Sequence, residues 1–405
     1  MRFRPILQVF FFLSVAAGAI CAQSAPMDLR RVLELADSDN LELRAARQQR
    51  AIALAGIQIA KQYPNPTIAF GITRDTPHET LTIDQPFEIA RQRSKRIAVA
   101  KEEQKSTDID ISVLARSIRH RTREAFYHAL TARAQAAQAK AALDLAAKLK
   151  DIAQQRFDVG DVAQLDVVET DVEVGRASAE YDLAVQEQKS ADAELAALLG
   201  RSPDESLSLQ GVLMDLPQAE SLPTNTAKAM ISNTAVQKSA QDVLTEEKRL
   251  ILVKAQRIPN IDVQAQGNFN NPPTYNAAFG GQVSATVPIF YHGQGEVAQS
   301  SARLELLKLT LQAQKLGASA QVAVAYYDYV AKANQAGQYA QKILPQTEKL
   351  ENMAEESYKA GKSNLLTVID AQRKLNEVRR AYLDILQAVQ AAFAVLEEAV
   401  GAPLD

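Results

Sequence analysis

The stretch QRFDVGDVAQLDVVETD, from Gln155 to Asp171, returns 201 residues later as ESYKAGKSNLLTVIDAQ, from Glu356 to Gln372. Aromatic, glycine, apolar and acidic residues occupy matching positions in the two stretches. Self-similarity at a long, fixed spacing indicates that one structural unit is written twice in the chain.

Other landmarks recur at nearly the same spacing, which extends the duplication over most of the chain. The matching pairs are Tyr63-Pro64-Asn65 with Ile258-Pro259-Asn260, Gln85-Pro86-Phe87 with Val287-Pro288-Ile289, Ala125-Phe126-Tyr127 with Ala325-Tyr326-Tyr327, and Leu199-Gly200 with Val400-Gly401. We therefore predict a first repeat over residues 23–200 and a second over residues 226–405. Residues 201–225, rich in Pro, Ser and Asp, are predicted to form a linker with a small capping segment.

Each repeat is predicted to hold a short helix, two strands, a very long helix, a turn and a long returning helix. Residues 97–156 and 297–358 are rich in Ala, Gln, Lys and Glu, with Pro345 as the one internal proline. Unbroken, each would be about 90 Å long. Gly160 and Gly361 follow these helices as C-terminal caps do, so each repeat becomes a helical hairpin. An apolar stripe that includes Leu143, Ala147, Ile152 and Phe157 is interpreted as an antiparallel coiled-coil seam.

Four strand windows alternate between apolar and polar residues, at 67–73, 80–84, 261–269 and 279–287. In the first, Ile68, Phe70 and Ile72 alternate with small or polar residues. Each strand pair lies between long helices, and no other core is available to cover its apolar face, which lipid could cover. Four strands cannot close a membrane barrel, because the smallest use about eight. Three chains would supply twelve strands.

The composition argues against several other classes of protein. The 45 basic and 48 acidic residues are mixed along the chain, so no basic stripe is available for nucleic acid. Arg2 and Arg4 precede an apolar run over residues 6–20, which predicts a signal peptide at residues 1–22. Cys21, the single cysteine, is either lipidated or removed with that peptide, and the sequence leaves this open.

The four histidines do not form a recognisable metal or catalytic motif. His120, Glu124 and His128 lie on one face of a helix, but the two histidines are about 12 Å apart by helix rise, too far for one ion. There is no Gly-rich phosphate loop, nucleophile elbow or zinc motif. We therefore predict no enzyme, no cofactor and no metal site.

Taken together, these features resemble the TolC-type outer membrane efflux family over nearly the whole mature chain. The resemblance is carried by the duplication, the Pro-Asn pair before the first strand of each repeat, and the turn from Gly160 to Asp166. Two segments resemble the branch that serves heavy metal pumps of the cobalt, zinc and cadmium type. These are QPFEIARQRSKR at 85–96, similar to Pro-x-Glu-x-Gly-Gly-Lys-Arg, and VPIFYHGQGEVAQS at 287–300, similar to Pro-Leu-Phe-x-x-x-Gln-Gly-Glu. Ala90 and Arg91 stand where that branch has two glycines.

The resemblance implies a mainly α fold with a transmembrane β-barrel: a homotrimer with a 12-stranded barrel in the outer membrane of a Gram-negative bacterium and an α-helical tunnel in the periplasm. It implies a passive exit duct of a tripartite efflux system, with a periplasmic adaptor and an inner membrane pump as partners and divalent metal cations as one candidate cargo. The adaptor would contact the hairpin tips, at Arg156, Phe157, Val159, Gly160, Tyr358, Ala360 and Gly361. Carboxylates at the narrow end of the tunnel would be Asp166, Glu169 and Asp370, with Thr367 at the remaining position.

Two alternatives remain at this level. One is the outer membrane duct of a type I protein secretion system, which the same architecture would serve. The other is a periplasmic coiled-coil scaffold or adaptor, which should lack alternating strands and carry a small barrel or lipoyl-like domain between its helices. The exported substrate, the pump and the gating trigger are not specified by the sequence.

Overall fold

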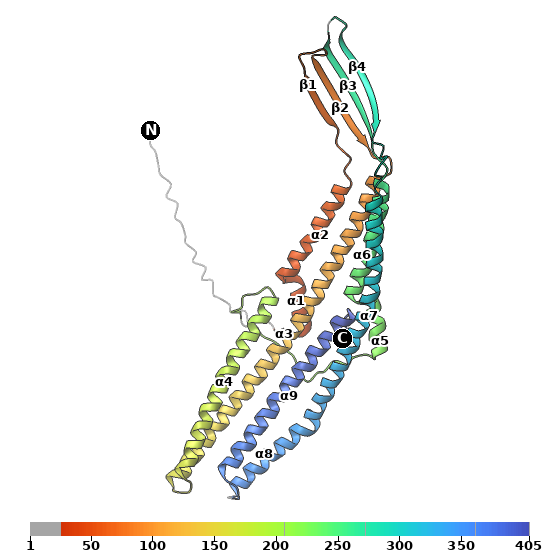
Figure 1. Ribbon diagram of the computed structural model, residues 1–405. Helices are drawn as coiled ribbons and strands as arrows, with labels where there is room; N and C mark the ends of the chain where they lie inside the picture. The colour runs from red at the N-terminus through yellow and green to blue at the C-terminus, as the bar shows by residue number, and fades with distance from the viewer. Residues whose placement is uncertain (1–25, 206, 272, 361, 405) are drawn as a thin grey trace, which may run out of the picture.

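The computed structural model describes residues 26–405 except 206, 272, 361 and 405. The predicted signal peptide and Cys21 lie outside these residues. The molecule is long and thin, with a four-stranded sheet at one end and the tips of two helical hairpins at the other (Figure 1). Among the described residues, no helix combines the length and the apolar character needed to cross a membrane.

The two repeats have the same order of elements. The first comprises α1 (Leu29–Asp39), α2 (Leu41–Ala60), β1 (Thr67–Ile72), β2 (Glu79–Phe87), α3 (Gln92–Asp158) and α4 (Gln164–Leu198). The second comprises α5 (Leu222–Ser232), α6 (Thr234–Gln256), β3 (Ile261–Asn271), β4 (Tyr275–Ala285), α7 (Gln294–Gln338), a π-helical turn η1 (Tyr339–Ile343), α8 (Leu344–Lys359) and α9 (Leu365–Val400). Helix α5 begins three residues before the end of the predicted linker.

Each repeat opens with two helices, whereas the sequence analysis predicted a single short helix. Asn40 separates α1 from α2, and Asn233 separates α5 from α6. Each asparagine caps the second helix, because its side-chain oxygen accepts from the backbone N–H three residues later, at 3.0 Å from Leu43 and 3.1 Å from Val236. Each also donates from Nδ2 to the end of the returning helix, at 2.9 Å to the Leu198 carbonyl and 2.8 Å to that of Ala399.

The glycine that closes each repeat packs against the same junction. Gly200 and Gly401 have φ of +67° and +78°, a left-handed conformation that favours glycine. A Cβ on Gly401 would lie 2.4 Å from the Ser232 carbonyl oxygen, and one on Gly200 would lie 2.7 Å from that of Asp39. The close backbone approach requires glycine at both positions.

The two long helices differ in continuity. Helix α3 is continuous over 67 residues, but its counterpart is interrupted at η1. There the backbone N–H of Leu344 donates to the carbonyl of Tyr339, five residues earlier. Pro345 follows directly, and it can neither donate to the carbonyl four residues before it nor fit against that carbonyl without distortion. The interruption is a single π-helical turn, the form in which π-helix usually appears inside α-helices.

The sheet has the strand order β1-β2-β3-β4, with every neighbouring pair antiparallel. Cross-strand partners lie on the same face of a sheet. The register pairs Ile68 with Ile83, Ile83 with Ala265, and Ala265 with Gly281, so apolar residues of all four strands share one face. The opposite face carries polar residues, among them Thr82, Asp84, Asp262, Gln264, Gln266, Gln282 and Ser284. The predicted alternation is confirmed by this register.

The helices next to the sheet repeat its order. Helix α2 contacts α3, α3 contacts α6, and α6 contacts α7, so the layer is α2-α3-α6-α7 with α2 and α7 at its edges. Farther from the sheet the order is α4-α3-α9-α8, with α4 and α8 at the edges. The long helices therefore lie side by side in a layer, with the short helices α1 and α5 packed against α3 and α7 near its middle.

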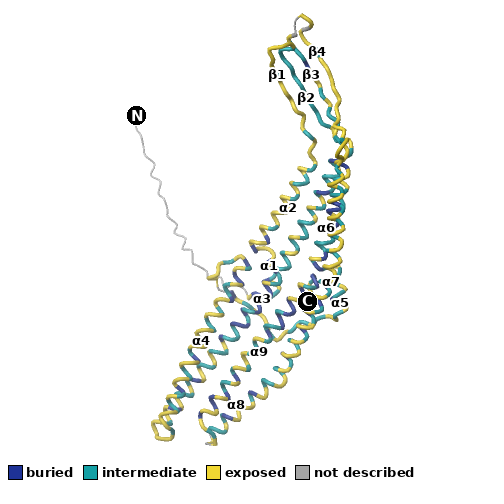
Figure 2. The backbone as a smooth tube through the Cα atoms, in the orientation of Figure 1, coloured by how far each residue is buried: buried dark blue, intermediate teal, exposed yellow. Residues whose placement is uncertain are grey.

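The core lies midway along the molecule, where the helix junctions and the linker meet α3, α4, α7 and α9 (Figure 2). Its largest fully buried side chains include Leu43, Ile118, Phe126, Leu195, Val322, Phe393 and Leu396. Towards the tips the buried residues of α3 are small. Ala146 and Ala153 are buried on α3. Of the predicted seam, Leu143 and Ala147 are half-buried and Ile152 and Phe157 are exposed, so that stripe lies only partly in the contact within one chain.

Candidate functional site: the hairpin tips

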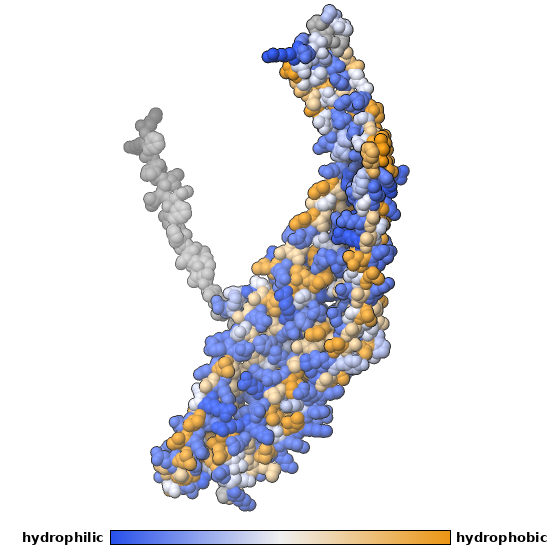
Figure 3. Space-filling view, viewed as in Figure 1, coloured by the Kyte–Doolittle hydropathy of each residue, from blue (hydrophilic) through white to orange (hydrophobic). Residues whose placement is uncertain are grey.

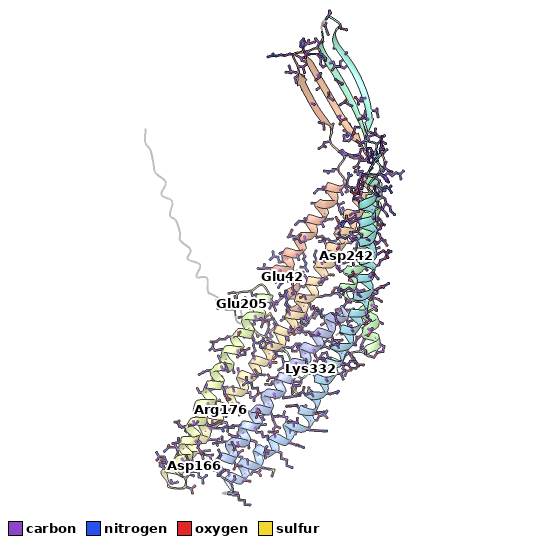
Figure 4. The ribbon with its side chains drawn as sticks, in the orientation of Figure 1. Glu42, Asp166, Arg176, Glu205, Asp242 and Lys332 are labelled. Atoms are coloured by element: carbon purple, nitrogen blue, oxygen red, sulfur yellow. The ribbon has the colours of Figure 1, made fainter. Side chains whose placement is uncertain are left out.

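The first tip is the turn between α3 and α4, at the end of the molecule opposite the sheet (Figure 4). The N–H of Asp161 donates to the Arg156 carbonyl at 2.8 Å, and Gly160 has a φ of +80°. This is the Schellman arrangement that ends helices at glycine. Phe157 and Val159 project from the turn and are exposed, so both are available for contact with another molecule.

The second tip, between α8 and α9, has the same backbone geometry. The N–H of Lys362 donates to the Ser357 carbonyl at 2.8 Å, which matches the bond at Asp161 in the first tip. Ala360 is exposed and Tyr358 is half-buried. The predicted tip residue Gly361 lies outside the described residues.

The structure brings the two tips of one chain into contact. The Arg156 guanidinium lies 5.1 Å from the centre of the Tyr358 ring, within the range of a cation–π interaction. The same guanidinium forms an ion pair with Asp161 at 2.7 Å. Beneath them, a small apolar cluster joins all four helices through Ala153, Val167, Tyr358, Leu365 and Ile369.

The predicted gate carboxylates lie one to two turns above the tips. Asp166 and Glu169 are half-buried on the first turns of α4, and Asp370 is exposed on α9. Among the described residues, no ion pair or hydrogen bond joins Asp166 or Glu169 to Asp370. Within one chain they are therefore separate carboxylates rather than one cluster.

Helix capping explains why the fourth position of this set is Thr367. Asn364 caps α9, accepting from the Thr367 N–H at 3.1 Å and from its hydroxyl at 2.6 Å. In the first repeat the capping position is Ala163, which offers no side-chain acceptor, and Asp166 lies in the first helical turn. A carboxylate there compensates the positive end of the helix dipole. Asp166 thus also has a local structural role.

A charged link between the hairpins was not found from the sequence. Arg373 of α9 donates from Nε to Glu173 of α4 at 3.0 Å, and a second bond runs from its Nη2 to the same carboxylate oxygen. These bonds raise the pKa of Arg373 above its usual value, so the guanidinium stays charged at physiological pH. Its Nη1 is also 3.9 Å from Asp370. The partners are 200 residues apart in the chain, and nothing in the local pattern connects them.

The two histidines on this face of α3, His120 and His128, contact different carboxylates. His120 lies 3.2 Å from Glu124 and 3.5 Å from Glu398, while His128 lies 3.3 Å from Glu187 and 3.7 Å from Glu194. In the described part of the chain, no group of three or more candidate ligands is arranged to hold a metal ion.

Replacing Arg373 with Met should loosen the contact between the tips while preserving most of the side-chain volume. Partly exposed ion pairs are worth up to about 1 kcal/mol, so local opening should become about fivefold more frequent. Amide hydrogen exchange over residues 150–175 and 357–373 measures this directly. Arg176→Met, which removes an exposed pair with Glu180 within α4, is the control. Equal exchange in both variants would contradict a role for Arg373 in joining the hairpins.

Comparisons with known proteins agree with this geometry. The profile of the family described as "Outer membrane efflux protein" matches residues 32–201 and 226–402, one segment for each repeat. The chain is 26% identical over 376 residues to the cobalt-zinc-cadmium resistance protein CzcC of Cupriavidus metallidurans, covering 92% of this chain and 90% of that protein.

Solved structures share the fold. A solved structure of CusC, a protein described as forming a transmembrane channel, is similar with a TM-score of 0.78 at 16% identity, covering 93% of this chain and 92% of that one. The outer membrane protein VceC of Vibrio cholerae is similar with a TM-score of 0.74 at 15% identity, covering 93% and 97%.

Proposed function

Because the chain belongs to the outer membrane efflux protein family, we propose that three copies form a continuous duct across the outer membrane and into the periplasm. Substrate passes through it passively, delivered by an inner membrane pump and a periplasmic adaptor. No catalytic step is assigned to the chain.

The proposal rests on the edges of the sheet and of the helical layer beneath it. In the described chain, neither layer has a partner at either of its two edges. The sheet ends at β1 and β4, and the helical layer beneath it ends at α2 and α7. Helix α2 leads into β1, and β4 leads into α7. One lateral contact between copies would therefore close both layers together, β4 against β1 and α7 against α2.

The outer helices carry apolar seams that no described residue of the same chain covers. On α2 the exposed positions are Leu41, Ala45, Ile52, Ala55 and Ile59, and on α7 they are Leu306, Leu309, Ala313, Leu316, Ala320, Val324 and Tyr327. These positions are separated by three, four or seven residues, the spacing of coiled-coil contacts. Farther down, Leu165, Val168 and Val172 on α4 and Leu350 and Met353 on α8 are exposed in the same way.

The proposed number of copies is supported by the size of the barrel. Strands β1 and β4 run antiparallel to each other, so β4 of one copy can pair with β1 of the next in the antiparallel sense. Two copies would make eight strands, and a barrel of that size is filled by its own side chains. Three copies make twelve strands, which leaves room for an aqueous lumen, and twelve helices in the layer below.

The two faces of the sheet fit a barrel in lipid. Phe279, Val283 and Ile68 of the apolar face are 81%, 70% and 67% exposed in the single chain, while the opposite face is polar. A membrane barrel turns its apolar residues to lipid and its polar residues to water. Phe269 and Phe279 form an edge-to-face pair on the lipid-facing side.

For the cargo, we propose divalent metal cations. Two features favour them: the 26% identical relative is described as a cobalt-zinc-cadmium resistance protein, and each chain carries Asp166, Glu169 and Asp370 near the tips. Nine carboxylates per trimer would attract cations to the tunnel entrance. The tips, with exposed Phe157, Val159 and Ala360, would contact the adaptor.

The test of the duct is to extract the protein from purified outer membranes in mild detergent, then measure oligomer mass and single-channel conductance. A trimer that conducts ions supports the proposal. A water-soluble monomer without channel activity would overturn it and favour a periplasmic scaffold.

Neutralising the three carboxylates, as Asp166→Asn, Glu169→Gln and Asp370→Asn, should lower the preference of the channel for cations. The reversal potential in a potassium chloride gradient should shift towards zero, because nine negative charges leave the entrance of the trimer. The control neutralises Asp182, Asp204 and Glu377, which are exposed carboxylates without an ion pair in the described structure. If both variants shift equally, general surface charge and not a gate sets the selectivity.

A further inference from the structure

A basic collar surrounds the junction between the sheet and the helices. We define it as residues 61–65, 87–96, 254–260 and 286–296. It contains seven basic residues, namely Lys61, Arg91, Arg93, Lys95, Arg96, Lys254 and Arg257, against two acidic ones, Glu88 and Glu296. The collar thus has a net charge of +5 in a chain whose net charge is −3.

Both acidic residues of the collar already have partners. Glu88 forms an ion pair with Arg96, and Glu296 accepts a hydrogen bond at 2.6 Å from the Tyr291 hydroxyl, which lowers the pKa of Glu296. Arg93, Lys95 and Arg257 donate to the backbone carbonyls of Lys61, Ala90 and His292. A carbonyl partner positions a cation without neutralising it.

Three cations of the collar are exposed and make no side-chain hydrogen bond or ion pair with the described protein: Lys61, Arg91 and Lys254. Arg91 is in the left-handed conformation, with φ +55° and ψ +35°, which costs a residue other than glycine about 1–2 kcal/mol. It also precedes the first turn of α3, where a positive charge opposes the helix dipole. Nothing in the local structure requires an arginine there, which points to a role in binding.

The collar also carries exposed apolar side chains. Phe290 is 94% exposed and Ile289 is 75% exposed, and Phe87, Ile89, Val287 and Tyr291 are also exposed. Phe87 is the register partner of Ile261, so this surface continues the apolar face of the sheet. Figure 3 shows hydrophobic and hydrophilic residues adjoining where the sheet meets the helices. A cationic ring at the end of an apolar surface matches the boundary between lipid chains and anionic headgroups.

We propose that the collar binds anionic phospholipids of the periplasmic leaflet, with Lys61, Arg91 and Lys254 on the headgroups and Ile289 and Phe290 in the acyl layer. This rests on the proposed barrel, because it needs the sheet to cross the membrane. The collar of each of the three copies would bind lipid headgroups. These contacts would fix the depth of the duct in the bilayer.

The test compares the wild-type trimer with the variant Lys61→Gln, Arg91→Gly, Lys254→Gln. Phosphatidylglycerol bound to each in detergent is measured by native mass spectrometry, with phosphatidylcholine and inorganic phosphate as the other probes. A cation near an anionic lipid surface contributes roughly fivefold in affinity, so binding of phosphatidylglycerol should fall at least tenfold. Phosphatidylcholine binding should not change. Arg91→Gly alone should weaken binding while raising thermal stability, because glycine removes the backbone strain.

The matched control removes three exposed, unpaired cations elsewhere, as Lys189→Gln, Lys315→Gln and Lys349→Gln. It should bind phosphatidylglycerol as the wild type does. Unchanged binding in the collar variant, equal loss in the control, or wild-type binding that does not distinguish the two lipids would overturn the inference. Displacement of the lipid by millimolar inorganic phosphate would instead assign the site to a free anion. If the wild type is not a trimer from the outer membrane, the proposed function itself fails.

Discussion

Val283→Arg should nearly abolish the accumulation of folded protein in the outer membrane, whereas Gln282→Arg should leave it close to normal. The two residues are neighbours on β4 but face opposite sides of the sheet, Val283 with Val263 and Gln282 with Gln264. On the lipid face, an arginine costs about 1 kcal/mol near the interface, rising to about 2–4 kcal/mol at the bilayer midplane, and a trimer carries three of them. On the lumen face, the same side chain stays in water.

The measurement is the amount of heat-resistant oligomer in isolated outer membranes, with total expression determined in parallel. A tenfold or greater loss for Val283→Arg, with less than a twofold change for Gln282→Arg, is expected. Equal behaviour of the two variants would show that the faces of the sheet are not in lipid and water. The two variants place the same residue on the same strand at adjacent positions, so the face of the sheet is the main difference between them.

Gly401→Ala should destabilise the protein by about 3 kcal/mol or more, even though it adds a single methyl group. The left-handed conformation accounts for about 1 kcal/mol of this. The rest arises because the new Cβ would lie 2.4 Å from the Ser232 carbonyl oxygen and 2.7 Å from the Asn233 Cα, so the backbone itself must move. Strain at a special backbone conformation and overpacking are both recognised causes of large losses.

Gly160→Ala provides the control for this prediction. Gly160 has a φ of +80°, almost the same as Gly401, but a Cβ there would meet nothing within 4 Å. Unfolding by guanidinium, followed by circular dichroism of the detergent-solubilised protein, should show a loss of about 1 kcal/mol for Gly160→Ala and a much larger one for Gly401→Ala. Similar losses would mean that the junction with Asn233 adapts easily and does not require close packing.

Features set by local periodicity could be predicted from the sequence. The alternation in Ile68, Phe70 and Ile72 has the two-residue period of a strand, and the register confirms its apolar face. The duplication is predicted from matching motifs, and the two halves of the structure have the same order of helices and strands. The role of Asp166, Glu169 and Asp370 stays a prediction, because it depends on other copies and on cargo.

Features set by contact between distant residues were missed. Asn40 and Asn233 read as ordinary polar residues in a helical stretch, and their role appears only when Leu198 and Ala399 are beside them. Arg373 and Glu173 likewise become partners only through the packing of the two hairpins. The seam along α2 and α7 has helical spacing, but spacing alone does not distinguish a buried stripe from one that faces a second copy.

The π-helical turn at Tyr339–Ile343 coincides with a difference in length between the two repeats. Above it, Phe126 of the first repeat corresponds to Tyr326 of the second, an offset of 200; below it, Gly160 corresponds to Gly361, an offset of 201. The second repeat has therefore gained one residue, or the first has lost one, between these landmarks. A π-helical turn accommodates a single extra residue without breaking the helix. Insertion or deletion of one codon after the ancestral gene duplicated accounts for the offset, and the turn keeps both tips at the same end of the molecule.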